Sequence, residues 1–257
     1  MKPIAVIAFA LALGCAADPP SDPDESEAWT VPHAPWNDPQ PQPPAPARFR
    51  DPAAARYHMR AHFNDLREIE QLLVAGKLDD GRTRAYLLTR EREIDEPGLA
   101  SWSDRARDVV DAATTLTKAS KLDDALRREA QVAVACARCH AATQSRLDFA
   151  AAPVLPADRQ TARTRMARHV WAVDRLWEGL VGADDARWSR GLAVLADDPL
   201  PFTPATDAPR LASELQQLAR AQLDKRATTL LEDRGAAYGE MLVRCAACHA
   251  SVHAGIH

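Results

Sequence analysis

Apolar side chains along most of this chain recur every three or four residues, which is the spacing of an amphipathic helix. Met59, His62, Leu66, Ile69 and Leu73 follow one another at steps of three, four, three and four positions. This spacing places all five side chains on one face of a helix. Runs in which polar and apolar residues alternate, as in half-buried strands, are scarce, so the pattern predicts an all-α protein.

The same stripe occurs a second time along the chain. Met166, His169, Val173, Leu176 and Leu180 repeat its steps and its leading Met-x-x-His, 107 positions later. A separate feature, the motif Cys-x-x-Cys-His, also occurs twice, at an offset of 109 positions. Two unrelated features that share nearly the same offset indicate an internal duplication.

Each repeat divides into four predicted helices with short connections. Such an arrangement favours an up-down-up-down bundle, so we expect two tandem four-helix bundles over residues 53–150 and 157–257. Prolines between 153 and 156 separate the two repeats. The predicted helices cover residues 52–75, 80–94, 99–120 and 121 to just past 140 in the first repeat, and residues 157–181, 184–196, 206–223 and 225–252 in the second.

The composition agrees with a helical protein and limits the classes of partner that we expect. The 257 residues include only 10 glycines, whereas Ala, Leu, Arg, Asp and Glu are abundant. Glycine disfavours helices, and most of the abundant residues favour them. The formal charge of -4 at pH 7 gives no reason to expect nucleic acid as a partner.

The first 15 residues resemble an export signal. Lys2 gives a basic start, and Ile4–Leu13 is an apolar run too short to cross a bilayer as a helix of the mature protein. Gly14 and Cys15 close this run as in bacterial lipoprotein signals, although Ala12 stands where such signals usually have Leu. We therefore expect Cys15 to carry lipid and to anchor the protein to a membrane. The alternative is an ordinary signal peptide in which Cys15 has no role.

Residues 16–52 are predicted to form a tether without a core. Five prolines fall within eight positions of this segment, between 39 and 46. Proline removes a backbone donor and holds the chain near the polyproline II conformation. The segment would therefore act as a spacer between the membrane anchor and the folded part, or as a disordered tail with no role.

Four of the five cysteines belong to the repeated motif, in the runs 136–140 and 245–249. In Cys-x-x-Cys-His, two thiols add across the vinyl groups of a haem and the following histidine binds the iron. Both copies lie in an exported chain, near the end of a predicted helix and at matching places in the two repeats. They predict two covalent c-type haems, with thioether bonds to Cys136, Cys139, Cys245 and Cys248 and axial ligands from His140 and His249.

Two other interpretations of the cysteines are weaker. A thiol–disulfide redox pair normally belongs to a βαβ unit, and neither motif lies in one. A single zinc site would need the four cysteines to meet across the boundary between the repeats, and it would leave His140 and His249 unexplained.

The paired motifs make residues 53–257 resemble, in tandem, the class II c-type cytochromes, which are cytochrome c-prime-like four-helix bundles. That family attaches its haem through Cys-x-x-Cys-His on the last helix. The run from Cys136 to His140 matches this pattern in the first repeat, and the run from Cys245 to His249 matches it in the second. The resemblance implies one haem in each bundle, and outside the motif the match is loose.

The second axial position of each iron has three candidate solutions. His62 and His169 are favoured because they repeat on apolar helix faces, where an unpaired imidazole would be costly and a metal bond would remove that cost. Met59 and Met166 lie on the same faces three residues earlier and are the rivals. A vacant position, which is common in the resembled family, is the third alternative.

These features together predict electron transfer rather than catalysis. We expect a periplasmic, lipid-anchored di-haem cytochrome that passes single electrons between redox partner proteins. No Ser/His/Asp pattern or Gly-rich phosphate loop indicates an enzyme. The alternatives are a protein that binds or senses NO or CO at a vacant axial position and, as a third choice, a di-haem peroxidase.

Overall fold

The structure of the chain is a computed structural model that describes residues 52–89, 100–145, 147, 149, 152–157, 160–197, 207–225 and 230–254. These residues belong to one compact unit, Gln42–His257. All regular structure within the described ranges is α-helical, which confirms the predicted all-α class. The predicted signal segment with Cys15 and the tether before Pro52 lie outside the described residues.

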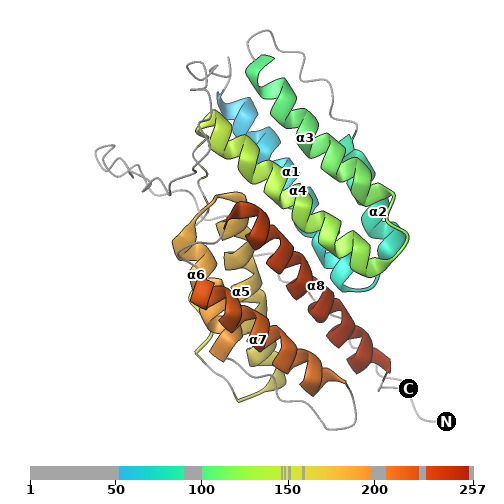
Figure 1. Ribbon diagram of the computed structural model, residues 1–257, viewed down its shortest axis with the longest axis vertical. Helices are drawn as coiled ribbons and strands as arrows, with labels where there is room; N and C mark the ends of the chain where they lie inside the picture. The colour runs from blue at the N-terminus through green and yellow to red at the C-terminus, as the bar shows by residue number, and fades with distance from the viewer. Residues whose placement is uncertain are drawn as a thin grey trace, which may run out of the picture. The chain divides into compact units, whose positions relative to one another are not determined.

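Eight helices make up the described part of the chain (Figure 1). In the first half, consecutive helices pack together and the fourth also contacts the first; the second half repeats this order. The helices are α1 (Pro52–Val74), α2 (Leu78–Thr89), α3 (Ala100–Thr117) and α4 (Leu122–Thr143), followed by α5 (Ala162–Val181), α6 (Asp185–Asp197), α7 (Ala208–Lys225) and α8 (Leu231–Ala254).

The helix ends reproduce the offset seen in the sequence. Helices α1 and α5 end at Val74 and Val181, which are 107 positions apart. Helices α4 and α8 begin at Leu122 and Leu231, which are 109 positions apart. The duplication therefore extends from the apolar stripe to the places where helices start and stop.

The turn after the first helix of each half is also repeated. Gly76 has φ 79°, and its equivalent Ala183 has φ 50°, so both adopt the left-handed conformation. One residue later, the Lys77 N–H donates to the Leu72 carbonyl at 2.9 Å, and the equivalent bond from Asp184 to Gly179 is also 2.9 Å. Glycine adopts this conformation without steric cost, whereas alanine is strained there.

Two predicted boundaries in the second half were wrong. Helix α5 begins at Ala162, not at residue 157, because Thr161 and Thr164 form a capping box that starts the helix there. Helix α8 begins at Leu231, not at residue 225, because Lys225 still belongs to α7. The predicted extension of the second helix beyond Thr89 lies outside the described residues.

Helices α4 and α8 pack along each other and join the two halves. Arg138, late in α4, pairs with Glu232, early in α8, at 2.7 Å. Arg127, early in α4, pairs with Glu240, further along α8, at 2.5 Å. The order of these partners shows that the two helices run antiparallel.

The halves are related by an approximate two-fold axis through this contact. A Cβ added to Gly239 would lie 3.4 Å from the Cβ of Ala130, its repeat equivalent, so the two helices approach closely there. Arg67 of α1 and Asp174 of α5, also repeat equivalents, form an ion pair. A residue that touches its own equivalent must lie near the axis that relates the repeats, as in a symmetric dimer.

One apolar core runs through both halves. It includes leucines of the two predicted stripes, such as Leu73 and Leu180, together with the fully buried Trp177, Trp188 and Tyr238. The duplicated halves therefore do not have separate cores, and each stabilises the other by burying apolar surface. Within the described ranges, no helix is long and apolar enough to span a membrane.

Candidate functional site

Each Cys-x-x-Cys-His motif lies in the last turns of the fourth helix of its half, on α4 and on α8. The first cysteines, Cys136 and Cys245, pack against the shared core. The second cysteine of α8, Cys248, packs against Ala208 and Leu211 of α7. The first sulfur of each motif therefore faces the molecular core.

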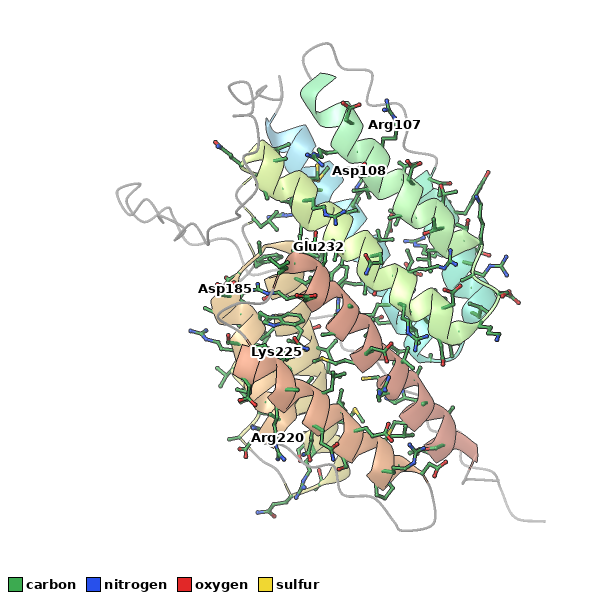
Figure 2. All side chains as sticks on the ribbon, viewed as in Figure 1. Arg107, Asp108, Asp185, Arg220, Lys225 and Glu232 are labelled. Carbon is green, nitrogen blue, oxygen red and sulfur yellow. The ribbon has the colours of Figure 1, made fainter. Side chains whose placement is uncertain are left out.

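The second cysteine of α4 has a position similar to that of Cys248. Burial raises the pKa of the Cys139 thiol, and the nearby charges of Arg105 and Asp108 on α3 act on it in opposite directions. Asp108 is an exposed residue midway along α3 (Figure 2). Cys139 thus lies towards the third helix of its half, as Cys248 does. The two sulfurs of a motif lie on adjacent sides of one helix, between the core and the third helix.

The thiols themselves are poorly suited to thiol–disulfide chemistry. Burial raises the pKa of Cys136 and of Cys245 to about 12, and the neighbouring acidic residues Glu129 and Glu70 add to this effect. Burial also raises the pKa of Cys248. Reactive cysteines have a lowered pKa because the thiolate is the nucleophile. The pKa of each of these four cysteines is raised instead, which weakens the interpretation of the motifs as thiol–disulfide redox pairs.

The first motif histidine is oriented by the other half. The Nδ1 atom of His140 lies 3.2 Å from the carbonyl oxygen of Val181, at the end of α5. When Nδ1 carries the proton and donates it to this carbonyl, Nε2 keeps its lone pair. Burial lowers the pKa of His140, although the carbonyl opposes the shift. A neutral ring with one nitrogen held by a backbone carbonyl is the usual state of a metal-binding histidine.

The predicted second axial ligands lie on the helices that contact the motif helices. His62 is half-buried on α1, which packs on α4, and His169 is 6 % exposed on α5, which packs on α8. Met59 and Met166 are half-buried one turn earlier on the same helices. The stripe is oriented as predicted, because its later members, such as Ile69 and Leu176, are fully buried.

The two motifs do not converge on one site. They begin six positions after Ala130 and Gly239, where the antiparallel helices cross, so they extend in opposite directions from the crossing. At 1.5 Å per residue, Cys136 and Cys245 are separated by about 18 Å along the helix axes. Among the described residues, no three His, Cys, Asp or Glu side chains are grouped as metal ligands would be.

Between the motifs lies a buried set of charged and aromatic groups that the sequence pattern did not predict. Glu70 of α1 is 3 % exposed. Its Oε1 accepts a hydrogen bond from Arg67 at 2.7 Å, and its Oε2 accepts one from the hydroxyl of Tyr238, on α8, at 2.6 Å. Arg67 also pairs with Asp174 of α5. The ring of Tyr238 lies 6.1 Å from that of Trp177.

Glu129 of α4 completes this set and differs from the other members. It is 0 % exposed, and neither carboxyl oxygen has a hydrogen-bond partner among the described residues. Burial raises its pKa well above the usual value, the charge of Glu70 adds to the shift, and Arg67 opposes it. Burial likewise raises the pKa of Glu70, against the effects of Arg67 and Tyr238. We call Arg67, Glu70, Glu129, Asp174 and Tyr238 the axial cluster, because they surround the pseudo-two-fold axis.

Two signals in the sequence could have revealed the axial cluster. Glu129 interrupts an otherwise apolar stripe, three positions after Leu126 and four before Ala133, both fully buried. At the repeat offsets, Glu70 aligns with Trp177 and Glu129 aligns with Tyr238. One repeat therefore has a carboxylate where the other has a large buried aromatic residue. Packing does not explain such a difference, which indicates that the carboxylates have a distinct local environment.

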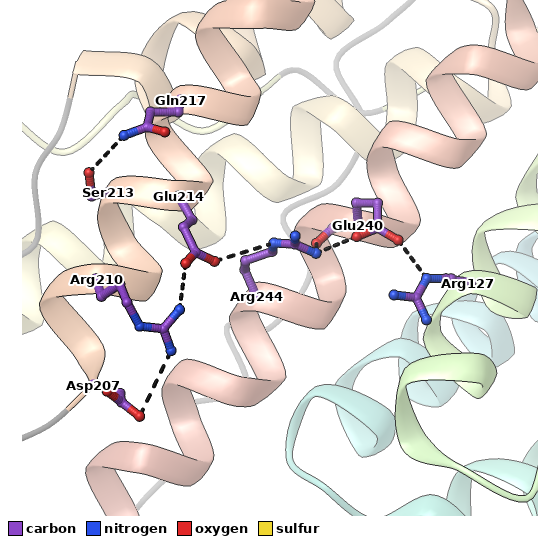
Figure 3. Close-up of polar contacts among 8 residues, drawn as sticks. All are labelled: Arg127, Asp207, Arg210, Ser213, Glu214, Gln217, Glu240 and Arg244. Carbon is purple, nitrogen blue, oxygen red and sulfur yellow. Dashed lines mark hydrogen bonds and ion pairs between the residues drawn. The ribbon is translucent and has the colours of Figure 1, made fainter.

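A chain of alternating charges crosses the outer surface of α8 (Figure 3). Arg244 of α8 pairs with Glu214 of α7 at 3.8 Å, and Glu240 of α8 pairs with Arg127 of α4 at 2.5 Å, so the chain connects α7 to α8 and α8 to α4. The hydrogen bond from Arg127 lowers the pKa of Glu240, against the effect of burial. Each exposed pair contributes little stability, but together they favour one alignment of the three helices. The series is Asp207, Arg210, Glu214, Arg244, Glu240 and Arg127.

Comparison with known proteins adds no relative. The chain matches no protein-family model, no curated protein and no solved structure.

Proposed function

We propose that this chain is an exported di-haem cytochrome c, built as two tandem four-helix bundles, that transfers single electrons between redox partner proteins. The observation that carries the proposal is the duplicated Cys-x-x-Cys-His motif, at equivalent places on α4 and α8. Haem c would be held by Cys136 and Cys139 in one half and by Cys245 and Cys248 in the other. His140 and His249 would bind the two irons.

The surroundings of the motifs are suitable for haem. The sulfurs of α4 lie between the core and α3, so a macrocycle joined to both would have apolar groups on one side. The bond from His140 to the Val181 carbonyl would orient the imidazole and keep Nε2 available to iron. When bound, the haem supplies the one-electron chemistry, and the protein sets the potential through its ligands, burial and nearby charges.

The proposal places the protein in the bacterial periplasm, anchored through lipid on Cys15. Its basis is the sequence of residues 1–15, which resembles an export signal that ends in a lipoprotein-type cysteine. No turnover of a small-molecule substrate is proposed. Reduction of peroxide and binding of NO or CO are the competing functions, and a vacant axial position would be required for either.

Mass spectrometry of protein matured in a host that assembles c-type cytochromes tests the proposal directly. The expected mass is that of the processed chain plus two haems. Replacement of both Cys136 and Cys139 by Ala should remove one haem, and the same change at Cys245 and Cys248 should remove the other. Cys15→Ala is the matched control, since it removes a cysteine outside the motifs and should leave both haems. The bare polypeptide mass with four free thiols would refute haem attachment.

Absorbance spectra of oxidised and reduced protein test the axial ligands. His62→Ala and His169→Ala should each convert one low-spin haem to a high-spin haem. Met59→Ala and Met166→Ala serve as comparisons, and a spin change in these variants alone would favour thioether ligands. If neither pair of variants changes the spectrum, the second axial position is vacant, and exposure to CO or NO then tests gas binding.

A further inference from the structure

The axial cluster contains more carboxyl groups than its one cation can neutralise. Glu70, Glu129 and Asp174 face a single guanidinium, that of Arg67. Both oxygens of Glu70 accept hydrogen bonds, and Asp174 is 35 % exposed, so these two carboxylates are stabilised by partners or solvent. Glu129 has neither, because it is fully buried and unpartnered among the described residues.

The helices packed around Glu129 bring it no second counter-charge. Helix α1 supplies Arg67 and Glu70, α5 supplies Asp174 next to Arg67, and α8 supplies the hydroxyl of Tyr238. On α4 itself, the titratable neighbour is the Cys136 thiol. Within the described part of α2 and α3, no charged side chain acts on the Glu129 carboxyl. With so little counter-charge, the proton affinity of this buried carboxyl responds strongly to a change of charge nearby.

The cluster lies between the two haem attachment sites and acts on both. Glu129 precedes Cys136 by seven positions, which places the two on one face of α4, about 10 Å apart along the axis. The charge of Glu129 acts on Cys136, and the charge of Glu70, from the first half, acts on Cys245 of the second half. The charge of Glu70 also acts on Glu129.

We propose that Glu70 and Glu129 form a proton-binding site shared by the two haem centres, in which one proton is taken up from solvent when a haem gains an electron and is released when that haem is oxidised. The inference rests on the proposed function, and the electron comes from the redox partner protein. One carboxylate gains the proton and becomes a neutral carboxyl, so the electron and the proton enter together.

Simple electrostatics gives the size of the coupling. Reduction lowers the charge of a haem by one unit, which favours a proton on a nearby carboxylate. At an effective dielectric constant of about 20, a unit charge about 10 Å away changes proton affinity roughly tenfold. Because the site is shared, a proton taken up for one haem also favours reduction of the other.

The test measures midpoint potentials of the complete di-haem protein between pH 5 and pH 9 by spectroelectrochemistry. The potential of at least one haem should fall as pH rises, by about 59 mV in all for a tenfold change in proton affinity, with a slope that stays below the one-proton limit of about 59 mV per tenfold change in proton concentration. Glu129→Gln, which keeps the shape of the side chain, should flatten this slope, and Glu70→Gln should reduce it. Unchanged slopes in both variants would overturn the assignment.

Asp108→Asn is the matched control. It removes a carboxylate whose charge acts on Cys139, but Asp108 is exposed on α3. The variant should shift potentials slightly and keep the slope. If Asp108→Asn flattens the slope as much as Glu129→Gln does, a surface carboxylate carries the proton and the proposal is wrong.

Infrared difference spectra of the unmodified protein give a readout that requires no variant to fold. Reduction should produce a carbonyl band of a protonated carboxyl, and this band should be missing in Glu129→Gln. Its absence from the unmodified protein refutes the proton site. Mass spectrometry and absorbance spectra show which of the two proposals has failed. Two haems with pH-independent potentials contradict the proton site alone. A chain without haem contradicts both proposals.

Discussion

The two halves of the molecule share a backbone plan but contribute different side chains to the place where they meet. The first half brings Arg67, Glu70 and Glu129 to the pseudo-two-fold axis. At the equivalent positions, the second half brings Asp174, Trp177 and Tyr238. Helix ends and turns repeat closely, so the divergence is concentrated in the side chains of the contact.

This difference is possible because the two repeats belong to one chain and can change independently. In a symmetric dimer, both partners must present the same surface, so a charge on the axis would face itself. In a fused chain, the two surfaces can become complementary. Three ion pairs between the halves follow this pattern, with arginine in the first half and a carboxylate in the second: Arg67–Asp174, Arg127–Glu240 and Arg138–Glu232.

The largest loss of stability is expected from replacing Trp177, which the second half contributes near the pseudo-two-fold axis. Trp177 is 0 % exposed and touches Phe63, Arg67 and Tyr238. Trp177→Ala should lower the free energy of unfolding by about 3–5 kcal/mol, because it leaves a large cavity in the shared core. Urea unfolding of the complete chain measures this. Trp171→Ala, at a half-buried position one turn and a half earlier, should cost less, and equal losses would contradict the central role of Trp177.

The close approach of α4 and α8 gives the next prediction. A Cβ at Gly235 would lie 2.3 Å from Cγ2 of Val134. Gly235→Leu should therefore destabilise the protein by about 1–3 kcal/mol, since the helices must separate to admit the side chain. Ala236→Leu adds a similar side chain at the neighbouring exposed position and should be nearly neutral in thermal unfolding. A neutral Gly235→Leu variant would show that the helices are further apart than this contact implies.

The buried carboxyl of the first half should weaken the protein at neutral pH. Burial raises the pKa of Glu129 in the folded state, so folding favours the protonated form. Stability should be highest below the unfolded pKa of about 4.3 and should fall as pH rises towards the folded pKa. The Glu129→Leu variant has an apolar side chain in place of the buried carboxyl. It should be more stable than the original protein by about 1 kcal/mol at pH 7.

Unfolding experiments at pH 4.5 and pH 7.5 check the sign of this effect. The advantage of Glu129→Leu should be smaller at the lower pH. An advantage that grows as the pH falls would mean that Glu129 is a stabilised carboxylate in the folded protein.

The ion pair at the start of α8 should have the smallest effect. Arg138 donates to Oε1 of Glu232 through Nε at 3.1 Å and through Nη2 at 2.7 Å, where α8 begins (Figure 2). Burial raises the pKa of Glu232, but the hydrogen bonds and charge of Arg138 outweigh it and the pKa is lowered. A double-mutant cycle with Arg138→Met and Glu232→Gln should give a coupling of about 0.2–1 kcal/mol, reduced by added salt. A salt-independent coupling would contradict an ionic origin.

Much of the fold could be predicted from the sequence because helix formation follows local patterns. The stripe from Met59 to Leu73 and its copy predicted the first helix of each half, and Leu66, Ile69 and Leu73 are buried as expected. The cysteine motifs were located on the last helices by the same reasoning. The start of α5 was misplaced because the prediction followed the apolar pattern, and the capping box of Thr161 and Thr164 is a weaker signal in a sequence than that pattern.

The sequence by itself determined the helices, the duplication and the places of the two motifs, because each depends on residues that are neighbours along the chain. The tertiary structure alone decided that α4 and α8 cross, that His140 meets the Val181 carbonyl and that Glu129 is buried opposite Glu70. These contacts join residues that are far apart in the sequence. Their energies depend on burial and on the distance between charges, which exist only once the halves have packed together.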